Sequence, residues 1–261
     1  MRRLATTLTL GAALAGCDGE TPINLFTIED DISLGMELRD EINGDPATYP
    51  VVPEADAPDA YDHLYRMRDA ILASGEVTHA DDFDWEIYLI DDDETLNAFA
   101  GPGGYIWVYS GIMRYLERED DLVGVLGHEI AHADRRHSTQ QLSKVYGVSV
   151  LLGVIFGSDP GLIPELAAGL VSLSFSRTDE ADADEHSVIY LCGTDYAANG
   201  AASFFEKLLE ESTVEIPAFL STHPASAERV ADINTLTEEL GCSTDPNPNV
   251  PPWADVLATL P

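Results

Sequence analysis

Apolar residues recur at helical spacing through most of the chain and alternate as in a strand only within its first half. Trp85 to Ile90 alternates in this way, and residues 97–100 and 105–109 predict two more strands around a Gly-Pro-Gly-Gly turn typical of a hairpin. The helical spacing predicts helices over residues 26–42, 59–74, 120–137, 141–156, 162–175, 179–192, 196–211 and 226–240. A small sheet followed by a helical remainder predicts a single α+β domain.

Three other segments are distinguished by composition. Residues 43–58 carry several prolines among acidic and small residues and predict a loop, and the proline-rich residues 243–261 predict a loosely held tail in which Trp253 and Leu257 could dock. Residues 145–156 and 162–175 are apolar nearly all round. Both are shorter than the about 20 residues that span a bilayer, so buried core helices are favoured over membrane contact.

The charge of the chain limits its partners. Its 261 residues include 13 lysines and arginines against 47 aspartates and glutamates, for a formal net charge of -34. Such a surface repels a phosphate backbone, so nucleic acid is not expected as a partner. It also repels anionic lipid headgroups, so any attachment to a membrane has to come from another feature.

The first residues are typical of an exported protein. Arg2 and Arg3 precede a short apolar stretch that ends in Leu14-Ala15-Gly16-Cys17. This ending resembles the bacterial lipobox, which implies cleavage before Cys17 and a lipid-anchored chain facing the periplasm or the cell exterior. Residues 1–16 are then a lipoprotein signal peptide and residues 17–58 a tether with the N-terminal helix. An ordinary signal peptide with a chance cysteine is the alternative, and inner and outer membranes both stay open.

Two further cysteines remain, Cys192 and Cys242. An exported compartment permits a disulfide between them, and two separate buried thiols are the alternative. Closing a loop of this length stabilises a fold by about 3–4 kcal/mol in the chain-entropy model.

The motif with the most specific chemistry is His128-Glu129-Ile130-Ala131-His132. On a helix the two histidines lie four residues apart on one face, where both imidazoles can bind one zinc ion, and Glu129 can take a proton from the attacking water. The alternative, two surface histidines with a glutamate, is disfavoured because the helix around them is apolar. Asp120 and Asp121 are expected to cap the start of this helix.

A catalytic zinc needs a third protein ligand. The metzincin pattern is excluded, because Arg135 and Ser138 stand where it has glycine and histidine. His137 comes one residue too early for that pattern and is expected to cap the helix end or bond nearby. Glu180 and Asp184, also four residues apart, could supply a ligand and an orienting carboxylate. From spacing alone, an acidic first turn that favours the helix dipole explains them equally well.

Several motifs together are more specific than any one of them. They are Asn97-Ala98-Phe99 with Pro102-Gly103-Gly104, the histidine motif at 128–132, Ser176-Arg177 with Glu180 and Ala183-Asp184, and, more weakly, His223-Pro224 with Glu228-Arg229. In this order they resemble the zinc metallopeptidase family of HtpX, the CAAX prenyl endopeptidases and bacterial lipoproteins such as LoiP. The resemblance covers residues 81–240 and departs from the family at Gly101 and Ala131, neither of which is a ligand.

The resemblance implies a zincin-like fold over residues 59–242, with an edge strand above the active-site helix and a C-terminal tail at 243–261. It makes His128, His132 and Glu180 the ligands of one zinc ion, Glu129 the general base and Asp184 the partner of a ligand. Asn97, Ala98 and Phe99 form the strand that an extended peptide would pair with. His223 would stabilise the oxyanion or be a removable fourth ligand; a structural histidine before proline is the alternative.

These assignments predict a zinc endopeptidase that cleaves extended segments of unfolded or misassembled cell-envelope proteins. A lipid-anchored chaperone or assembly factor with a zinc site and little proteolysis is the alternative, and Glu129 argues against it because a pure holder has no need of a base. A small-molecule zinc hydrolase fits the peptide-like strand less well. Substrate identity, cleavage site and oligomeric state stay open.

Overall fold

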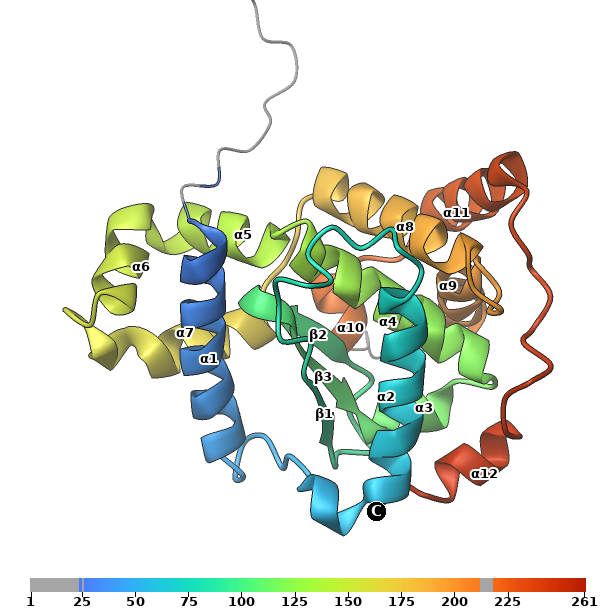
Figure 1. The fold of residues 1–261 in the computed structure, drawn as a ribbon, viewed down its shortest axis with the longest axis horizontal. Coiled ribbons are helices and arrows are strands. Elements are labelled where there is room, and N and C mark those ends of the chain that lie inside the picture. The colour runs from blue at the N-terminus through green and yellow to red at the C-terminus, as the bar shows by residue number, and fades with distance from the viewer. Residues whose placement is uncertain (1–23, 25, 212–217) are drawn as a thin grey trace, which may run out of the picture.

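The computed structural model describes residue 24 and residues 26–211 and 218–261, so Cys17 and the predicted signal peptide lie outside the described residues. Helices surround a small central sheet (Figure 1). The helices are α1 (Ile28–Gly44), α2 (Pro58–Leu72), α3 (Ser110–Tyr115), α4 (Glu119–Asp134), α5 (His137–Tyr146), α6 (Val148–Ile155), α7 (Ile163–Val171), α8 (Arg177–Cys192), α9 (Gly200–Glu211), α10 (Ala218–Thr222), α11 (Ala227–Leu240) and α12 (Trp253–Leu257). The mostly helical composition with a small mixed sheet confirms the predicted α+β class.

The sheet has the order β1-β3-β2, with β1 (Ile87–Ile90) parallel to β3 (Tyr105–Tyr109) and β2 (Ala98–Gly101) antiparallel to it. The turn between β2 and β3 contains Gly103 at φ 76° and Gly104 at φ 87°, a region that favours glycine. The hairpin predicted from the glycine turn is therefore confirmed.

The predicted first strand begins too early. Trp85 has a φ of 48°, which turns the chain just before β1, and its indole nitrogen donates to the carbonyl of His79. The strand accordingly begins at Ile87.

Alternation along β3 separates two apolar cores. Ile106 and Val108 face a core built with α2, α4, α8, α9 and α11, whereas Trp107 and the flanking tyrosines face a second core with α1, α6 and α7. In Figure 1 the helices of the second core lie on the left of the sheet and α4, α8 and α9 on the right. Because β3 is buried on both faces, its residues are all aliphatic or aromatic.

Helix α4 runs through the first core and is buried along its whole length. Close packing against it depends on glycine: a Cβ atom at Gly124 would lie 2.1 Å from the backbone nitrogen of Ala201, and one at Gly127 would lie 2.7 Å from Ser187 Oγ. These contacts bring α8 and α9 against the part of α4 that carries the histidine motif.

The predicted helix at residues 141–156 is divided in two. Gly147 has a φ of 81°, which ends α5 and starts α6. Helix α7 buries its apolar face as predicted, but α6 buries only Leu151 and Val154, and Phe156 beside it is 76% exposed. Among the described helices none is by itself long and apolar enough to cross a bilayer; α6 and residues 160–171 together reach that length but are bent by 109°.

The C-terminal segment is held more firmly than predicted. Helix α12 docks through Val256, which is fully buried, and the indole nitrogen of Trp253 donates to the carbonyl of Leu116. The expectation of a loosely held tail is therefore wrong at this end, while the proposed docking of Trp253 is confirmed. The short helices α3 and α10 were also missed, because five or six residues carry too little periodicity to be recognised.

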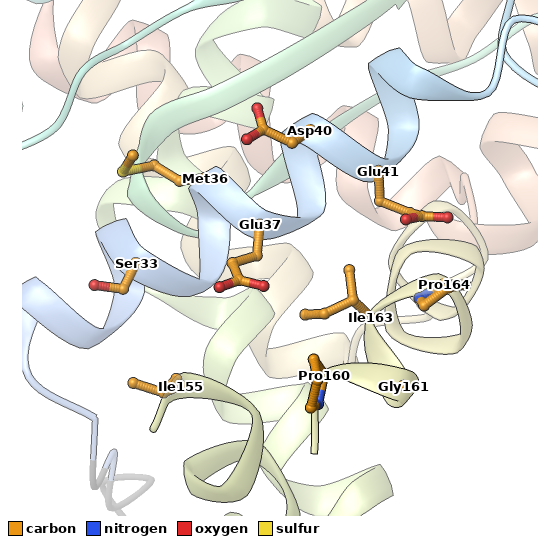
Figure 2. A pocket seen from close by; sticks show the side chains of 10 residues that line it. All are labelled: Ser33, Met36, Glu37, Asp40, Glu41, Ile155, Pro160, Gly161, Ile163 and Pro164. Atoms are coloured by element: carbon orange, nitrogen blue, oxygen red, sulfur yellow. The ribbon is translucent and has the colours of Figure 1, made fainter. Parts of the chain in front are cut away.

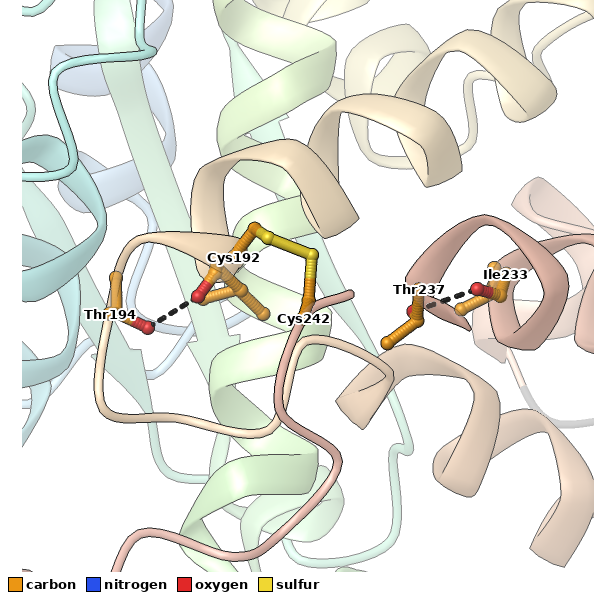
Figure 3. Close-up of a disulfide and its surroundings, with 6 residues drawn as sticks. Cys192, Thr194, Ile233, Thr237 and Cys242 are labelled. Atoms are coloured by element: carbon orange, nitrogen blue, oxygen red, sulfur yellow. Dashed lines mark hydrogen bonds between the residues drawn. A yellow bond between two sulfur atoms is a disulfide. The ribbon is translucent and has the colours of Figure 1, made fainter. Parts of the chain in front are cut away.

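Cys192 and Cys242 form a disulfide, as expected. Figure 3 shows that it joins the end of α8 to the segment that follows α11. The bond therefore ties the C-terminal segment to a helix that also carries Glu180 and Asp184.

Candidate metal centre

Four side chains from three parts of the chain converge in the first core. His128 and His132 come from α4, Glu180 from the first turn of α8, and His223 from the segment just after α10. One potential ligand atom from each residue lies within 4.8 Å of the other three, and all four residues are buried. The structure thus brings together the three predicted ligands and the predicted cleft histidine.

Local signals in the sequence set these positions. Helix α8 begins with a capping box, in which Ser176 Oγ accepts from the backbone N–H of Asp179 and the Asp179 carboxylate accepts from that of Ser176. This start places Glu180 and Asp184 one turn apart on the same face. Asp120, in contrast, does not cap α4 as predicted: its carboxylate accepts from the backbone N–H groups of Ala197 and Asn247, and so ties two loops to the helix.

The nitrogen atoms at the centre face one another. Nε2 of His128 lies 3.0 Å from Nε2 of His132 and 3.3 Å from Nδ1 of His223. Three imidazole nitrogens and a carboxylate oxygen of Glu180 are thus close enough to one another to converge on a single cation. Two imidazoles and a carboxylate with a third imidazole beside them are a donor set that zinc prefers.

The outer nitrogen of His128 is held by an acid. Its Nδ1 lies 2.9 Å from Asp184 Oδ1, which keeps the proton on Nδ1 and leaves the Nε2 lone pair for a metal. Burial alone would lower the pKa of His128, but the carboxylates of Asp184 and Glu180 raise that pKa to about 9. Asp184 therefore lies where the resemblance placed it.

Arg229 has a role that sequence reasoning missed. Its guanidinium lies 2.6 and 2.7 Å from the two carboxylate oxygens of Asp184 and 2.7 Å from Glu180 Oε2, over the ring of Phe205. It thus fixes the orientation of both acids. The weak match at Glu228-Arg229 was the signal available for it in the sequence.

Glu180 and Glu129 differ in their electrostatic environment. Burial favours the neutral form of Glu180, but the imidazoles of His223, His128 and His132 hold its pKa well below the usual range. Burial raises the pKa of Glu129, although the nearby His223 and His128 oppose the shift. Among the described side chains Glu129 Oε1 has no hydrogen-bond partner, and His223 Nε2 is 3.6 Å away. Glu129 is thus a carboxylate with a free oxygen and an increased affinity for a proton.

The predicted substrate strand lies beside this centre, and its register decides which groups it offers. The carbonyl of Asn97 accepts from the backbone N–H of Tyr109, so the alternate residues Ala98 and Ala100 turn their backbone groups away from β3. The ring of Phe99 stacks on Trp107 with a centroid distance of 4.8 Å, in the second core. Its side chain is therefore a packing element, and the backbone carries the potential for pairing.

This edge is covered in the present conformation. Ala98 has no exposed surface, the carbonyl of Ala100 accepts from Ser138 Oγ, and the carbonyl of Leu96 accepts from the N–H of Phe219 in α10. A peptide can therefore pair with this strand only after Ser138 and α10 have moved away from it.

A surface pocket of about 830 Å³ lies apart from the centre, between α1 and the segment formed by α6 and α7. Figure 2 shows Glu37, Asp40 and Glu41 projecting from α1 on one side and Pro160 and Ile163 on the other. None of its lining residues belongs to the histidine cluster, so its position gives it no part in the chemistry of the centre.

Comparison with known proteins agrees with this geometry. The family model of Peptidase family M48 matches residues 62–237, more than half of the chain. The chain belongs to peptidase family M48. This confirms the resemblance inferred from the motifs, and the matched M48 segment includes all four residues of the cluster. Members of M48 use zinc, and the cluster can hold one such ion.

Relatives within the family differ in how much of the chain they share. The mitochondrial metalloendopeptidase OMA1 of Schizosaccharomyces pombe is 32% identical over 183 residues, which are 68% of this chain and 53% of that protein. The metalloprotease LoiP of Escherichia coli is 25% identical over 89% of this chain and 95% of its own length. The beta-barrel assembly-enhancing protease of the same organism is 27% identical over 60% of this chain and 35% of its length. The chain thus spans about half of the fission-yeast OMA1.

Proposed function

We propose that this chain is a zinc-dependent endopeptidase that cleaves extended segments of unfolded or misassembled envelope proteins. The observation that carries the proposal is the buried cluster of His128, His132 and Glu180 with the unpartnered oxygen of Glu129 beside it. Membership of peptidase family M48 supports it. The three residues of the cluster would hold zinc, with Asp184 and Arg229 orienting two of them.

The residues divide the reaction between them. Zinc, when bound, polarises the scissile carbonyl and acidifies a water molecule. Glu129 takes a proton from the attacking water at Oε1 and passes it to the leaving amine; its raised pKa suits both transfers. The first core excludes bulk water around the cluster, which strengthens each electrostatic interaction within it.

His223 would act as a removable fourth ligand. Its Nδ1 lies 3.0 Å from Glu180 Oε1 and 3.3 Å from His128 Nε2, close enough to occupy a further position on a metal held by those two residues. The backbone of Phe219, four residues earlier, bonds to Leu96 at the start of the substrate strand. A movement of α10 would therefore open both the strand and the metal.

The substrate class follows from the strand. Pairing through Ala98 and Ala100 would use hydrogen bonds to the backbone of the substrate, so it admits many sequences but requires an extended segment. The name of one relative, the beta-barrel assembly-enhancing protease of Escherichia coli, supports a site of action in the bacterial envelope, where beta-barrel proteins are assembled. The same proposal includes removal of residues 1–16 and anchoring through a lipid on Cys17. It divides the rest of the chain into a tether with the N-terminal helix at 17–58, a peptidase domain at 59–242 and a tail at 243–261.

A second candidate, a chaperone or assembly factor that rarely cleaves, is favoured by one observation. With His223 beside the cluster and the strand covered, the site is closed and would hold zinc without access for a substrate. The two candidates differ in whether the closed site opens.

Digestion of an unfolded protein distinguishes them. Reduced, carboxymethylated casein is incubated with the wild-type protein, Glu129→Gln and His223→Ala, with a tightly folded protein as the parallel substrate. We expect cleavage of casein alone, loss with Glu129→Gln, and faster cleavage with His223→Ala. If zinc-loaded wild-type and His223→Ala proteins both leave casein intact, the endopeptidase proposal is wrong and the holding function gains support.

A further inference from the structure

His137 is the nearest polar neighbour of His132 on the side away from the cluster. Its Nδ1 lies 3.0 Å from Nδ1 of His132, and its Nε2 lies 3.2 Å from Asp182 Oδ2. Arg135 holds the same carboxylate oxygen from 2.8 Å. A line of polar atoms thus leads from a partly exposed acid through one imidazole to the outer nitrogen of another.

We propose that His137 is the positioning residue for His132, and that Asp182, His137 and His132 form a relay that fixes the tautomer and ring orientation of a zinc ligand. The proposal goes beyond the zinc site proposed above and rests on His132 being a ligand.

The proton positions follow from the chemistry of imidazole. If Nε2 of His132 gives its lone pair to zinc, the proton of that ring must be on Nδ1. The hydrogen bond at 3.0 Å then requires a lone pair on Nδ1 of His137, whose own proton must lie on Nε2. There it faces Asp182, the acceptor that this arrangement needs. Every group in the relay therefore has one consistent role.

Packing completes the restraint on His132. Its ring is fully buried and stacks on Phe175 with a centroid distance of 4.0 Å and an interplanar angle of 24°. The stack fixes the plane of the ring, but a flip within that plane would exchange its carbon and nitrogen atoms. The hydrogen bond to His137 is what distinguishes the two orientations, because only one of them places Nδ1 toward it.

The two histidines of the motif are therefore supported differently. Nδ1 of His128 lies 2.9 Å from the carboxylate of Asp184, whereas Nδ1 of His132 faces the ring of His137, which in turn has the carboxylate of Asp182 behind it. His137 begins α5, and Arg136 before it has a left-handed φ of 63°. The sharp change of direction at that residue is what turns His137 back toward His132.

Zinc affinity of the purified protein, measured by competition with a fluorescent zinc chelator, tests the relay. His137→Leu removes the acceptor and is expected to weaken zinc binding about 10–100-fold, whereas His137→Asn keeps an acceptor at the position of Nδ1 and should remain within about threefold of wild type. Asp182→Asn keeps a weaker acceptor for His137 and should cost about 3–10-fold. His186→Asn is the matched control, because His186 lies beside Asp182 but outside the relay, and no change is expected.

A second measurement does not depend on affinity. In the zinc-loaded protein, imidazole nitrogen NMR should show His137 as the neutral form protonated on Nε2 and His132 protonated on Nδ1. A purely structural histidine at position 137 would not require that tautomer.

Wild-type zinc affinity in a folded His137→Leu variant would overturn the relay, as would His137 protonated on Nδ1. If His137→Leu does not fold, Asp182→Asn against His186→Asn decides, and equal affinities would overturn it. His132→Ala distinguishes failure of the zinc site from failure of the relay. Unchanged zinc affinity in His132→Ala would refute His132 as a ligand. Weaker zinc binding in His132→Ala without weaker binding in His137→Leu would refute the relay alone.

Discussion

Nδ1 of His128 lies 2.9 Å from Oδ1 of Asp184, and Arg229 holds the same carboxylate from its other side. The acid therefore acts on the metal centre through an imidazole, and both of its oxygens are already occupied. Replacing it should disturb the centre without removing a ligand.

Asp184→Asn is expected to weaken zinc binding about 10–100-fold, because the amide is a poorer acceptor for His128 and loses the ion pair with Arg229. Competition with a zinc chelator measures the change. Glu185→Gln, one residue further along α8 and exposed, makes the same change of charge and should leave the affinity unaltered. Equal affinities of the two variants would show that Asp184 does not support the ligand.

Gly124→Ala should destabilise the protein by about 1–3 kcal/mol, because the added methyl group meets the backbone of α9 where no flexible side chain can give way. Urea unfolding followed by circular dichroism measures it. Gly153→Ala in α6 is the matched control: its Cβ would meet only Ser158 Oγ at 3.4 Å, so that helix should gain stability, if anything. An unchanged free energy of unfolding in Gly124→Ala would contradict the close contact between α4 and α9.

The disulfide between Cys192 and Cys242 should contribute about 3–4 kcal/mol to the free energy of unfolding, since it closes a loop with a sequence separation of 50. The double replacement by serine should lose that amount, and reducing agent should have no further effect on the variant. A wild-type protein that unfolds identically with and without reducing agent would contradict the contribution.

Asp31 gives a dependence on pH that is opposite to that of an ordinary ion pair. Burial raises the pKa of Asp31 above the ordinary value of an aspartate, and the hydrogen bonds from Arg136 and Thr139 offset this only in part. A raised folded-state pKa favours folding fully below the unfolded-state pKa, and that contribution is lost as pH rises through the folded-state value. The stability of the wild type relative to Asp31→Asn should therefore fall as the pH rises above the unfolded-state pKa of about 4, as urea unfolding at each pH would show. A relative stability that rises over this range would contradict the shift.

The sequence predicted the parts of the site that lie within one helix. His128, Glu129 and His132 follow from spacing along α4, and Glu180 and Asp184 from spacing along α8 together with the resemblance. Periodicity of this kind is visible in a single sequence because the residues involved are close neighbours in the chain.

Relationships between elements were harder to predict. Arg229 reaches Asp184 across 45 residues, and Asp182 reaches His137 through the packing of α8 beside α4. Such contacts depend on how glycines such as Gly127 let the helices approach, which periodicity does not record. Two errors in the predicted elements each depend on a single backbone angle, which periodicity also does not record. The positive φ of Gly147 divides one predicted helix, and the positive φ of Trp85 delays the start of β1.

The central claim is that one metal site, formed by His128, His132 and Glu180, hydrolyses peptide bonds with Glu129 as the base. The most direct test measures zinc content and casein cleavage on the same samples of wild type, Glu129→Gln and Glu180→Gln. We predict one zinc per chain with cleavage in the wild type, one zinc without cleavage in Glu129→Gln, and loss of both in Glu180→Gln. Cleavage by Glu129→Gln, or a full zinc content in Glu180→Gln, would contradict the account.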